Sequence, residues 1–362
     1  IVFADYARTW ATNNVIIDSN GNNFQGDPDT YTVDYSTAGQ SLNIVYSDAT
    51  KGWLPVSDDA VAFDHGNPPT QRAIFGYGYS GSQTSITNLV TSSGVVGTDV
   101  TGVGTARSYL AAAGYGFDKV IFGYGNTGSV TALTNLVSNS GVVAADVSGV
   151  GTARKQIAAT TYGGDKAIFG YGRTGTPVVT MTNLVNNSGV VGSDVTGVGG
   201  ATQNKGATAY GSTGLAMFFE GDDEDGIPVA SINLVSNTGV VASDTSAAGT
   251  PRSFFGTATY GGDKAAFSFG SDGVGPISGT KTNLITNTGV IGADITLVGT
   301  ARYYLAAAGY GADKGIFGYG YDGSSRVSMT NLMTNVGVIG TDVTGVGTAR
   351  QGLAAAGYSG AA

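Results

Sequence analysis

Six copies of one segment of about 50 residues fill most of the chain, and this repeat limits the architecture more than any other feature. Each copy contains an asparagine followed by leucine, and the intervals between these asparagines are 47, 48, 50, 50 and 48 residues. A fixed period of this length is typical of proteins in which each repeat is one supersecondary unit stacked on its neighbours. We number the copies first to sixth by these asparagines, which are Asn88, Asn135, Asn183, Asn233, Asn283 and Asn331.

Each copy has the pattern of four β-strands. In the second copy we expect strands over residues 110–115, 120–124 and 134–137, and a fourth that starts near Val142. Aromatic and β-branched residues alternate there with small ones, and Asp, Asn, Ser and Gly supply the turns. Four strands in a repeat of this length predict an all-β fold, a six-bladed β-propeller.

The two ends of the repeat region predict how such a ring closes. The first copy begins with a second strand, residues 73–77, and has no clear first strand before it. Residues 353–358 form an extra first strand after the sixth copy. We expect this C-terminal strand to complete the first blade. The predicted organisation is a small β domain over 1–66, a linker at Asn67-Pro68-Pro69, and a propeller over 67–362.

Composition excludes several classes of protein. Glycine supplies 60 of 362 residues, but it lacks the three-residue period of collagen, and 41% apolar residues argue against disorder. The absence of cysteine and the single histidine exclude disulfides and multi-histidine metal centres. A net charge of −9 without a basic run argues against a nucleic-acid partner, and no apolar stretch is long enough to span a membrane. Because the chain begins at Ile1 without a signal-peptide pattern, we expect a processed or partial product of a longer gene.

The repeat resembles the kelch family. An arginine precedes the first strand, the second strand ends in Phe122-Gly123-Tyr124-Gly125, and a Thr-Gly or Asp-Gly turn follows. The resemblance covers residues 72–362 and departs from kelch because the tryptophan of the fourth strand is missing. The unit is more similar to kelch-like Gly-Tyr-Gly repeats of bacteriophage structural proteins, often those of marine phages.

Residues 1–66 do not repeat, and they resemble the small β domains of phage tail fibres. We expect strands over 14–18, 31–35 and 41–46, with Asn20-Gly21 as a hairpin turn. The resemblance implies a domain that forms a homotrimer, contacts other virion proteins and carries a receptor-binding head. It also implies a location on the virion surface, outside the cell.

Two sets of residues have a candidate catalytic role, and both favour a structural interpretation. An arginine ring (Arg107, Arg154, Arg252, Arg302 and Arg350) has the charge to grip a carboxylate substrate, as sialidase propellers do. A residue used in nearly every copy is better explained as a structural element, and no sialidase Asp-box is present. His65 has no Gly-x-Ser-x-Gly nucleophile elbow to serve. We therefore predict no enzyme activity and no cofactor.

The fourth copy holds an acidic segment at residues 220–226. Asp222, Asp223 and Asp225 resemble part of a calcium loop, but the full ligand spacing is not met. The alternative is a solvated hairpin tip.

The copies differ most at the connection between strands two and three and at the two residues after each arginine. Because strand direction alternates, both sets emerge on one side of the sheets, which we call the loop face. Variable polar and aromatic loops on a constant scaffold are typical of recognition, whereas neutral drift of exposed tips is the alternative. The candidate binding residues are Tyr79, Gln83, Tyr109, Asn126, Arg173, Phe254, Asp272, Tyr303, Tyr321 and Arg326.

These patterns and resemblances together predict a phage fibre or appendage protein whose propeller head binds a host-surface glycan or protein during adsorption. A purely structural decoration or filament subunit is the alternative. A glycan-cleaving propeller is a third hypothesis, which requires carboxylates, or Tyr and Arg, at one end of the central channel.

Overall fold

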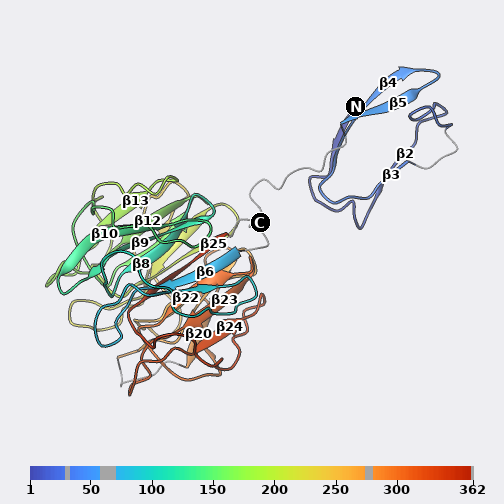
Figure 1. Ribbon diagram of the computed structural model, residues 1–362. Coiled ribbons are helices and arrows are strands. Elements are labelled where there is room, and N and C mark those ends of the chain that lie inside the picture. Colours follow the sequence, from blue (N-terminus) through green and yellow to red (C-terminus); the bar gives the residue numbers. More distant parts are fainter. Residues whose placement is uncertain (29–32, 58–70, 274–279, 360–362) are drawn as a thin grey trace. The chain divides into compact units, whose positions relative to one another are not determined.

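The structure is a computed structural model that describes residues 1–28, 33–57, 71–273 and 280–359 (Figure 1). Within these residues the chain is all-β, with 25 strands, no helix and eight small antiparallel sheets. It divides into two compact units, Ile1–Gly66 and Asn67–Ala362, which are described separately here. His65 and the Asn67-Pro68-Pro69 segment lie outside the described residues.

The first unit contains two sheets. One has the order β1 (Val2–Ala4), β4 (Ser41–Asp48), β5 (Gly52–Ser57), and the other pairs β2 (Val15–Ile17) with β3 (Val33–Tyr35). Residues 31 and 32 of the expected strand 31–35 lie outside the described residues. The buried side chains between these strands are Trp10, Phe24, Tyr35, Leu42 and Ile44.

The expected hairpin at Asn20-Gly21 is wrong as a connection between strands. Both residues have positive φ, 52° and 78°, which a tight Asn-Gly turn needs. However, β2 ends at Ile17 and β3 begins only at Val33. A longer loop therefore joins the two strands, and the local turn lies within it.

The second unit contains six sheets, one for each copy of the repeat. The inner strands are β25 (Ala354–Ser359), β8 (Ala111–Tyr115), β11 (Ala158–Tyr162), β14 (Gly206–Tyr210), β18 (Gly256–Tyr260) and β22 (Ala306–Tyr310). The middle strands are β6 (Gln71–Gly76), β9 (Lys119–Asn126), β12 (Lys166–Gly170), β15 (Leu215–Phe219), β19 (Lys264–Ser268) and β23 (Lys314–Gly318). The third strands are β7 (Thr87–Val90), β10 (Val130–Val137), β13 (Thr182–Val185), β16 (Ser231–Val235), β20 (Lys281–Ile285) and β24 (Thr330–Met333).

The predicted fourth strand is regular in only two copies, as β17 (Thr245–Ser246) and β21 (Ile295–Thr296). In the second copy the fourth segment makes isolated bridges, Val143 to Val137 and Val147 to Thr134. Between these two bridges the fourth segment advances four residues, from Val143 to Val147. The third strand advances only three, from Thr134 to Val137, so a bulge interrupts the ladder. The side chain of Asn135 donates to the carbonyl oxygen of Ala144 (3.0 Å), and this bond takes the place of a backbone partner.

The first copy is completed by the end of the chain. Strand β25 pairs with β6 from Ala354 opposite Gly76 to Ser359 opposite Gln71, and β6 pairs with β7 on its other side. This pairing confirms that residues 354–359 supply the strand that the first copy lacks. In the other five copies the first and second strands are consecutive in the chain and a short turn joins them, as between β8 and β9.

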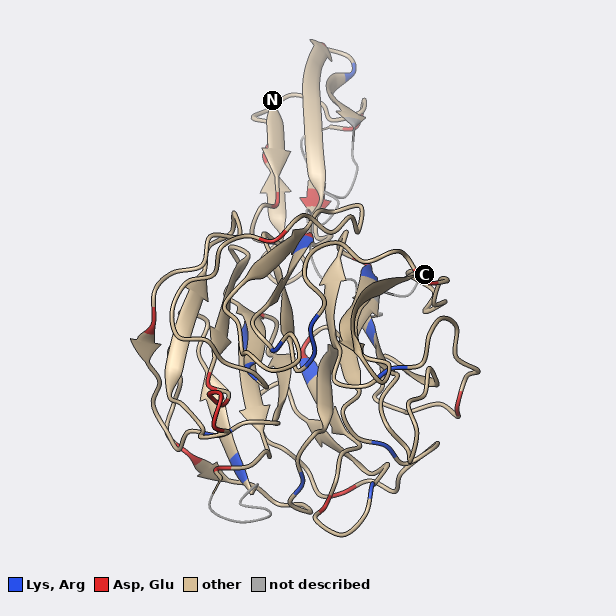
Figure 2. Cartoon of the chain, turned by 90° about the vertical axis from the view of Figure 1, so that its left-hand side faces the viewer, with Lys and Arg blue, Asp and Glu red and all other residues tan. Residues whose placement is uncertain are grey.

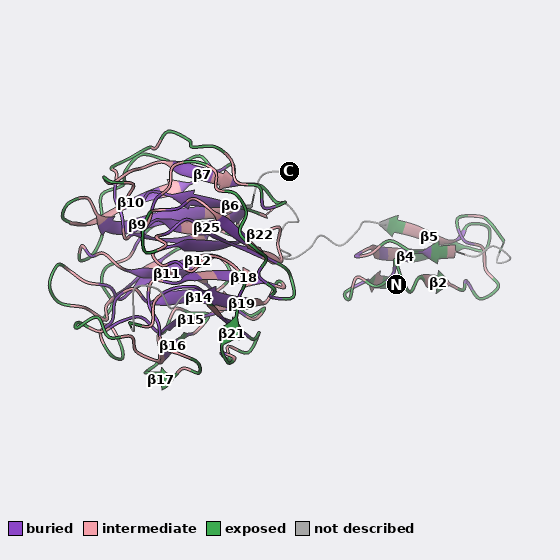
Figure 3. Cartoon of the chain, turned by 90° about the horizontal axis from the view of Figure 1, so that it is seen from below, coloured by how far each residue is buried: buried purple, intermediate pink, exposed green. Residues whose placement is uncertain are grey.

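The inner strands contact one another in a cycle. Each contacts the inner strand of the next copy, in the order β8, β11, β14, β18, β22 and β25, and β25 contacts β8 again. Buried side chains of adjacent sheets share one cluster; Phe122 of the second copy, for example, packs with Ile74 and Ala354 of the first. Figure 3 shows the buried strands inside this unit and the exposed loops around them.

A second cycle consists of backbone hydrogen bonds. The last glycine of the Gly-Tyr-Gly position donates its N–H to the carbonyl oxygen of the residue at the Arg position of the next copy, at 2.9 to 3.3 Å. The six bonds run from Gly78 to Arg107, Gly125 to Arg154, Gly172 to Thr202, Gly221 to Arg252, Gly270 to Arg302 and Gly320 to Arg350. The last of these returns to the strand that completes the first copy.

Repeated glycine is required where adjacent sheets approach each other. A Cβ on Gly123 would lie 2.6 Å from Cζ of Phe169 in the next copy, and Gly76 has the same relation to Phe122. A larger residue at this position would push the phenyl ring out of the core.

Candidate functional site

Short backbone bridges that recur in every copy assemble the loop face. In the second copy Ser108, which follows the buried Arg107, exchanges two backbone hydrogen bonds with Asn126 (2.8 and 3.0 Å). Asn126 begins the connection between strands two and three. The two variable connections of each copy therefore lie together. The equivalent bridges are Lys155–Arg173, Gln203–Asp222, Ser253–Ser271, Tyr303–Tyr321 and Gln351–Tyr79.

The residue after each of these bridges belongs to a ring, which we call the mouth. The mouth consists of Tyr109, Gln156, Asn204, Phe254, Tyr304 and Gly352. All six have φ between 52° and 60°, the left-handed conformation that non-glycine residues seldom adopt. At five of the six positions the backbone N–H donates to the carbonyl oxygen of the mouth residue in the preceding copy, at 2.7 to 3.0 Å. These bonds explain why the strained conformation recurs.

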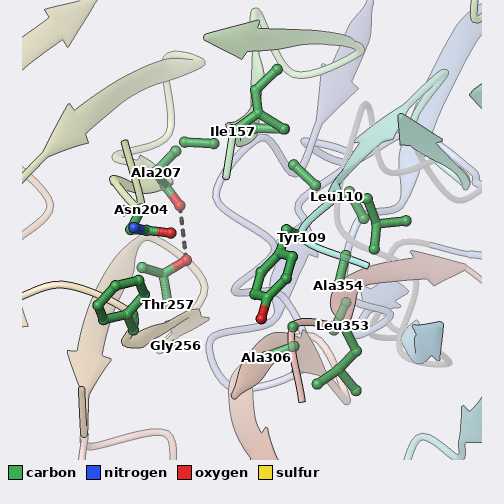
Figure 4. A pocket seen from close by; sticks show the side chains of 18 of the residues that line it. Tyr109, Leu110, Ile157, Asn204, Ala207, Gly256, Thr257, Ala306, Leu353 and Ala354 are labelled. Atoms are coloured by element: carbon green, nitrogen blue, oxygen red, sulfur yellow. Dashed lines mark hydrogen bonds between the residues drawn. The ribbon is translucent and has the colours of Figure 1, made fainter. Parts of the chain in front are cut away.

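The mouth opens on a cavity of about 140 Å³ between the inner strands (Figure 4). The wall contains a ring of larger residues that follow the mouth residues in the chain, Leu110, Ile157, Lys205, Phe255, Leu305 and Leu353, and a ring of small residues where the six inner strands converge. The first residues of these strands are Ala111, Ala158, Gly206, Gly256, Ala306 and Ala354. Deeper in the wall, the Thr257 hydroxyl donates to the carbonyl oxygen of Ala207 (2.9 Å), so it is satisfied within the protein.

One side of the mouth is aromatic. The ring centroid of Tyr304 lies 4.3 Å from that of Phe254, 4.9 Å from that of Tyr303 and 5.5 Å from that of Tyr109. The Tyr109 ring also lies against Gly352, where a Cβ would approach within 3.0 Å of the ring. Because position 352 is glycine, the Tyr109 ring can lie over the mouth position of the first copy. Figure 4 shows the Tyr109 ring projecting into the pocket.

The other side of the mouth is polar. Asn204 donates from Nδ2 to Asp222 Oδ1 (2.9 Å), and Gln203 donates from Nε2 to Asp222 Oδ2 (3.3 Å). Burial raises the pKa of Asp222 to about 6, although these amide hydrogen bonds oppose the shift. The side chain of Gln156 has no hydrogen-bond partner among the described residues. It is free to pair with a ligand.

The repeated arginines are structural, as their recurrence predicted. Arg154 is fully buried; its Nε donates to the carbonyl oxygen of Tyr171 (3.0 Å) and its Nη2 to Asn183 Oδ1 (2.6 Å). Asn183 in turn donates to Asp194 (3.0 Å). The guanidinium lies 4.6 Å from the ring centroid of Tyr124 in the preceding copy, so it also bridges two sheets. No charge of this kind is left to hold a carboxylate substrate.

The fourth copy replaces this arginine by a lysine three residues later. Thr202 occupies the arginine position, and Lys205 occupies a position that is Leu, Ile or Phe in the other copies. Lys205 Nζ lies 4.9 Å from the ring centroid of Tyr171 and donates to the carbonyl oxygen of Glu220 (3.2 Å). These are the ring and the carbonyl positions that the arginines contact elsewhere. Lys205 thus restores both contacts from a different place in the chain.

Glu220 makes this copy unusual in a second way. It replaces the tyrosine or phenylalanine of the Gly-Tyr-Gly position, is almost fully buried, and accepts a hydrogen bond from the Arg252 N–H at Oε2 (3.1 Å). Its Oε1 atom is buried without a partner. Burial raises the pKa of Glu220 to about 8 and lowers the pKa of Lys205 to about 8. At neutral pH the carboxyl is therefore protonated.

The acidic segment 220–226 is only in part a solvated tip. Asp222 is buried and engaged by Asn204 and Gln203, whereas Asp225 is exposed. Asp223 Oδ1 accepts the backbone N–H groups of Asp225 (3.0 Å) and Ile227 (2.9 Å) and so stabilises its own turn. Among the described residues no group of three His, Cys, Asp or Glu side chains has an arrangement for a metal ion. The calcium alternative gains no support from this geometry.

The ten predicted binding residues are all half-buried, and they fall into two groups. Tyr109 and Phe254 lie at the mouth, and Tyr303 and Tyr321 extend its aromatic side, with 5.6 Å between their ring centroids. The others lie on separate tips around it: Tyr79 with the guanidinium of Arg326 4.6 Å from its ring centroid, Gln83, Asn126, Arg173 and Asp272. Residues 274–279 of the fifth tip lie outside the described residues.

Sequence reasoning missed four of the six mouth residues: Gln156, Asn204, Tyr304 and Gly352. Gln156 and Tyr304 are the second residues after an arginine, so the equivalence with Tyr109 was available as a signal. Asn204 was hidden because its copy has Thr202 at the arginine position. Counting back six residues from Tyr210, the tyrosine that ends its inner strand, would have aligned it with the others.

Charged residues are sparse along the chain, 12% of the total (Figure 2). No protein-family model matches the sequence, and no curated protein is significantly similar to it. A membrane-crossing helix is not found in the described part of the chain.

Proposed function

We propose that the second unit is a closed six-bladed β-propeller of the kelch-like type, with one blade from each repeat. Three observations support closure: the cycle of contacts between inner strands, the six hydrogen bonds from Gly-Tyr-Gly to the next copy, and the pairing of β25 with β6. Propeller blades contain four strands, and the bulged fourth segment at the edge of four of the sheets is compatible with that pattern.

We further propose that this propeller is the head of a bacteriophage fibre or appendage protein and binds a host-surface glycan or protein. The sequence resemblance supports the phage context. The binding role is supported by a contrast between the scaffold positions and the mouth positions of the six copies. Equivalent scaffold positions are the same in nearly every copy, as with Arg154, Asn183 and Asp194. Equivalent mouth positions are Tyr, Gln, Asn, Phe, Tyr and Gly. A constant scaffold with a variable, partly exposed surface is typical of recognition sites.

Such a head acts by contact rather than by chemistry. The ionisable groups nearest the mouth are tyrosines, Asp222 and Lys205. The carboxylate of Asp222 is held by two amides, and Lys205, which lines the cavity, donates to the carbonyl oxygen of Glu220. The arginines that a glycan-cleaving enzyme would use are buried in the scaffold. If the first unit trimerises the protein, three heads on one fibre multiply a weak affinity through effective concentration.

Binding of the labelled full chain to a glycan microarray and to a panel of bacterial strains tests this function. We expect binding to a restricted set of glycans or strains, reduced by Tyr303→Ala together with Tyr321→Ala on the loop face. Val142→Ser on the opposite turns is the matched control and should bind normally. Absence of binding to every glycan and every strain would overturn the proposal.

One observation favours a second candidate, a structural subunit that packs against other particle proteins. The turn between strands three and four carries one valine in each copy, and each is 60 to 66% exposed. The six valines are Val95, Val142, Val190, Val240, Val290 and Val338. Repeated exposed apolar groups are typical of contact surfaces. Sedimentation of the purified chain separates the candidates, because a structural subunit self-associates through these valines and Val→Ser variants abolish that association.

A further inference from the structure

The mouth presents hydrogen-bonding groups that the protein does not use. Within the described part of the chain, the phenol groups of Tyr109 and Tyr304 and the carboxamide of Gln156 have no hydrogen-bond partner. All three side chains line the cavity and are half-buried. Polar groups that converge on a concave site and lack partners are typical of ligand pockets.

The size of the cavity limits the ligand to about one ring. Its volume is about 140 Å³. A protein cavity of about 150 Å³ holds one benzene-sized molecule. The mouth therefore accommodates a single six-membered ring with its substituents, and a longer chain has to continue over the loop face.

The two sides of the mouth and its floor offer three different surfaces. Tyr304, Phe254 and Tyr109 supply apolar ring faces, on which the C–H face of a sugar ring can pack. Gln156 and Asn204 on the other side supply amide donors and acceptors. The floor of alanine and glycine accepts a small apolar group such as a methyl, whereas it offers little to a hydroxyl.

The charge at the mouth disfavours an anionic ligand. Asp222 lies beside Asn204 and supplies a carboxylate on the polar side. The nearest cation, Lys205, is committed to the carbonyl of Glu220 and to Ser231 Oγ (2.9 Å). A negatively charged sugar would meet the field of Asp222, and Lys205, the cation that lines the cavity, is engaged by its own partners.

Building on the proposed function, we propose that the mouth is a subsite for a neutral 2-acetamido hexose. The sugar ring packs on Tyr304 and Tyr109, the acetamide group pairs with Gln156, and its methyl enters the alanine-lined cavity. A hexose without the acetamide lacks both the amide partner and the methyl, so it binds weakly. Recognition of a whole glycan then combines this subsite with contacts from the surrounding tips.

Saturation-transfer NMR with the full chain tests the subsite. The probes are methyl N-acetyl-β-glucosaminide and methyl N-acetyl-β-galactosaminide, with methyl β-glucoside as the sugar control. We expect transfer to the acetyl methyl of at least one acetamido sugar and none to the glucoside. Gln156→Leu should raise the Kd about tenfold or more, the cost of one lost hydrogen bond that leaves a polar group unpaired. Gln351→Leu is the matched control, because Gln351 lies outside the cavity lining.

The outcomes separate this inference from the function on which it rests. Loss of the acetamido signal in Gln156→Leu but not in Gln351→Leu supports the subsite. Binding of the wild-type chain to cells or glycans with no acetamido signal, or with equal signals in both variants, overturns the subsite and leaves the head function standing. Failure of the wild-type chain to bind any cell, glycan or probe overturns both.

Discussion

At the scale of single residues, Arg154 and Arg173 show how one side-chain type serves two purposes. Arg154 is buried and joins a carbonyl, an amide and an aromatic ring. Among the described residues, the guanidinium of Arg173 donates only to the carbonyl oxygens of Gly175 (2.9 Å) and Thr176 (2.7 Å) in its own exposed tip. The two positions therefore provide a comparison of scaffold and loop within one molecule.

Replacement of Arg154 by alanine should destabilise the protein by about 3 kcal/mol or more, because it leaves buried partners of a charged group unpaired. Arg173→Ala should change the free energy of unfolding by no more than about 0.5 kcal/mol. Denaturant unfolding of both variants measures the difference. Equal midpoints would contradict a structural role for Arg154.

Glu220 should make stability depend on pH between about 4.5 and 8. Its pKa is raised mainly by burial, to about 8 from 4.5, whereas Arg252 and Lys205 oppose the shift and Asp294 adds to it. The folded state thus holds a proton that the unfolded chain releases, and the associated stability is present below pH 4.5 and is lost as the pH rises towards 8.

The variant Glu220→Gln, which cannot lose that proton, provides the test. Its free energy of unfolding relative to the wild type should increase steadily from pH 5 to pH 8 and then level off. Thermal unfolding of both proteins in matched buffers at pH 5, 6, 7 and 8 measures it. A difference that does not vary with pH would show that Glu220 ionises normally.

At the scale of elements, the glycine at or just after the end of each middle strand joins two neighbouring sheets. Gly125 has a φ of 110° and donates its N–H to the carbonyl oxygen of Arg154 in the next copy. A Cβ there would lie 2.8 Å from the carbonyl oxygen of Ser108. Gly128, three residues later, has a φ of 114° and no atom within 4 Å of such a Cβ.

Alanine at these two positions separates backbone strain from steric exclusion. Both variants place alanine at an unfavourable φ, but only Gly125→Ala also brings a Cβ against a neighbouring segment. The free energy of unfolding of Gly125→Ala should therefore be about 1–3 kcal/mol lower than that of Gly128→Ala. Urea unfolding of the pair measures the extra loss. An equally large loss of stability in Gly128→Ala would mean that the unfavourable φ alone accounts for the effect.

The repeat allowed the strands, but not the mouth, to be predicted. Alternation and turn residues located the inner and middle strands within one or two residues, because these elements are set by local pattern and burial. The fourth strand was overestimated because in four of the copies the fourth segment pairs with the third strand only through isolated bridges, with a bulge between them. Whether Tyr303 or Tyr304 reaches the cavity depends on the positive φ of Tyr304, 55°, which is imposed by hydrogen bonds between copies, so only the equivalence of Tyr304 with Tyr109 in the repeat could have indicated it.

At the scale of the whole molecule, the first sheet of the second unit depends on one strand from the other end of the repeat region. Arg350 and β25 complete the first copy from the far end of the chain: Arg350 donates from Nε to the carbonyl oxygen of Tyr77 (2.8 Å), 273 residues away, and β25 covers the buried β6. Their removal would expose Ala73 and Phe75, which are fully buried.

A chain that ends at Gly347 should therefore lose the cooperative unfolding transition of the second unit and aggregate. A chain that ends at Ser359 keeps β25 and should unfold as the full chain does. Calorimetry and size-exclusion chromatography measure both properties. An unchanged melting temperature in the shorter chain would show that the ring does not need its C-terminal strand.

The same pairing determines the order of events during synthesis. Strand β6 is the first of the repeat region to leave the ribosome, and its partner β25 is the last. The second to sixth copies can form their sheets in sequence as they emerge, whereas the first keeps an open, apolar edge for the whole of translation. Completion of the second unit therefore waits for β25, and the growing chain needs protection at β6 for longer than at any other strand of this unit.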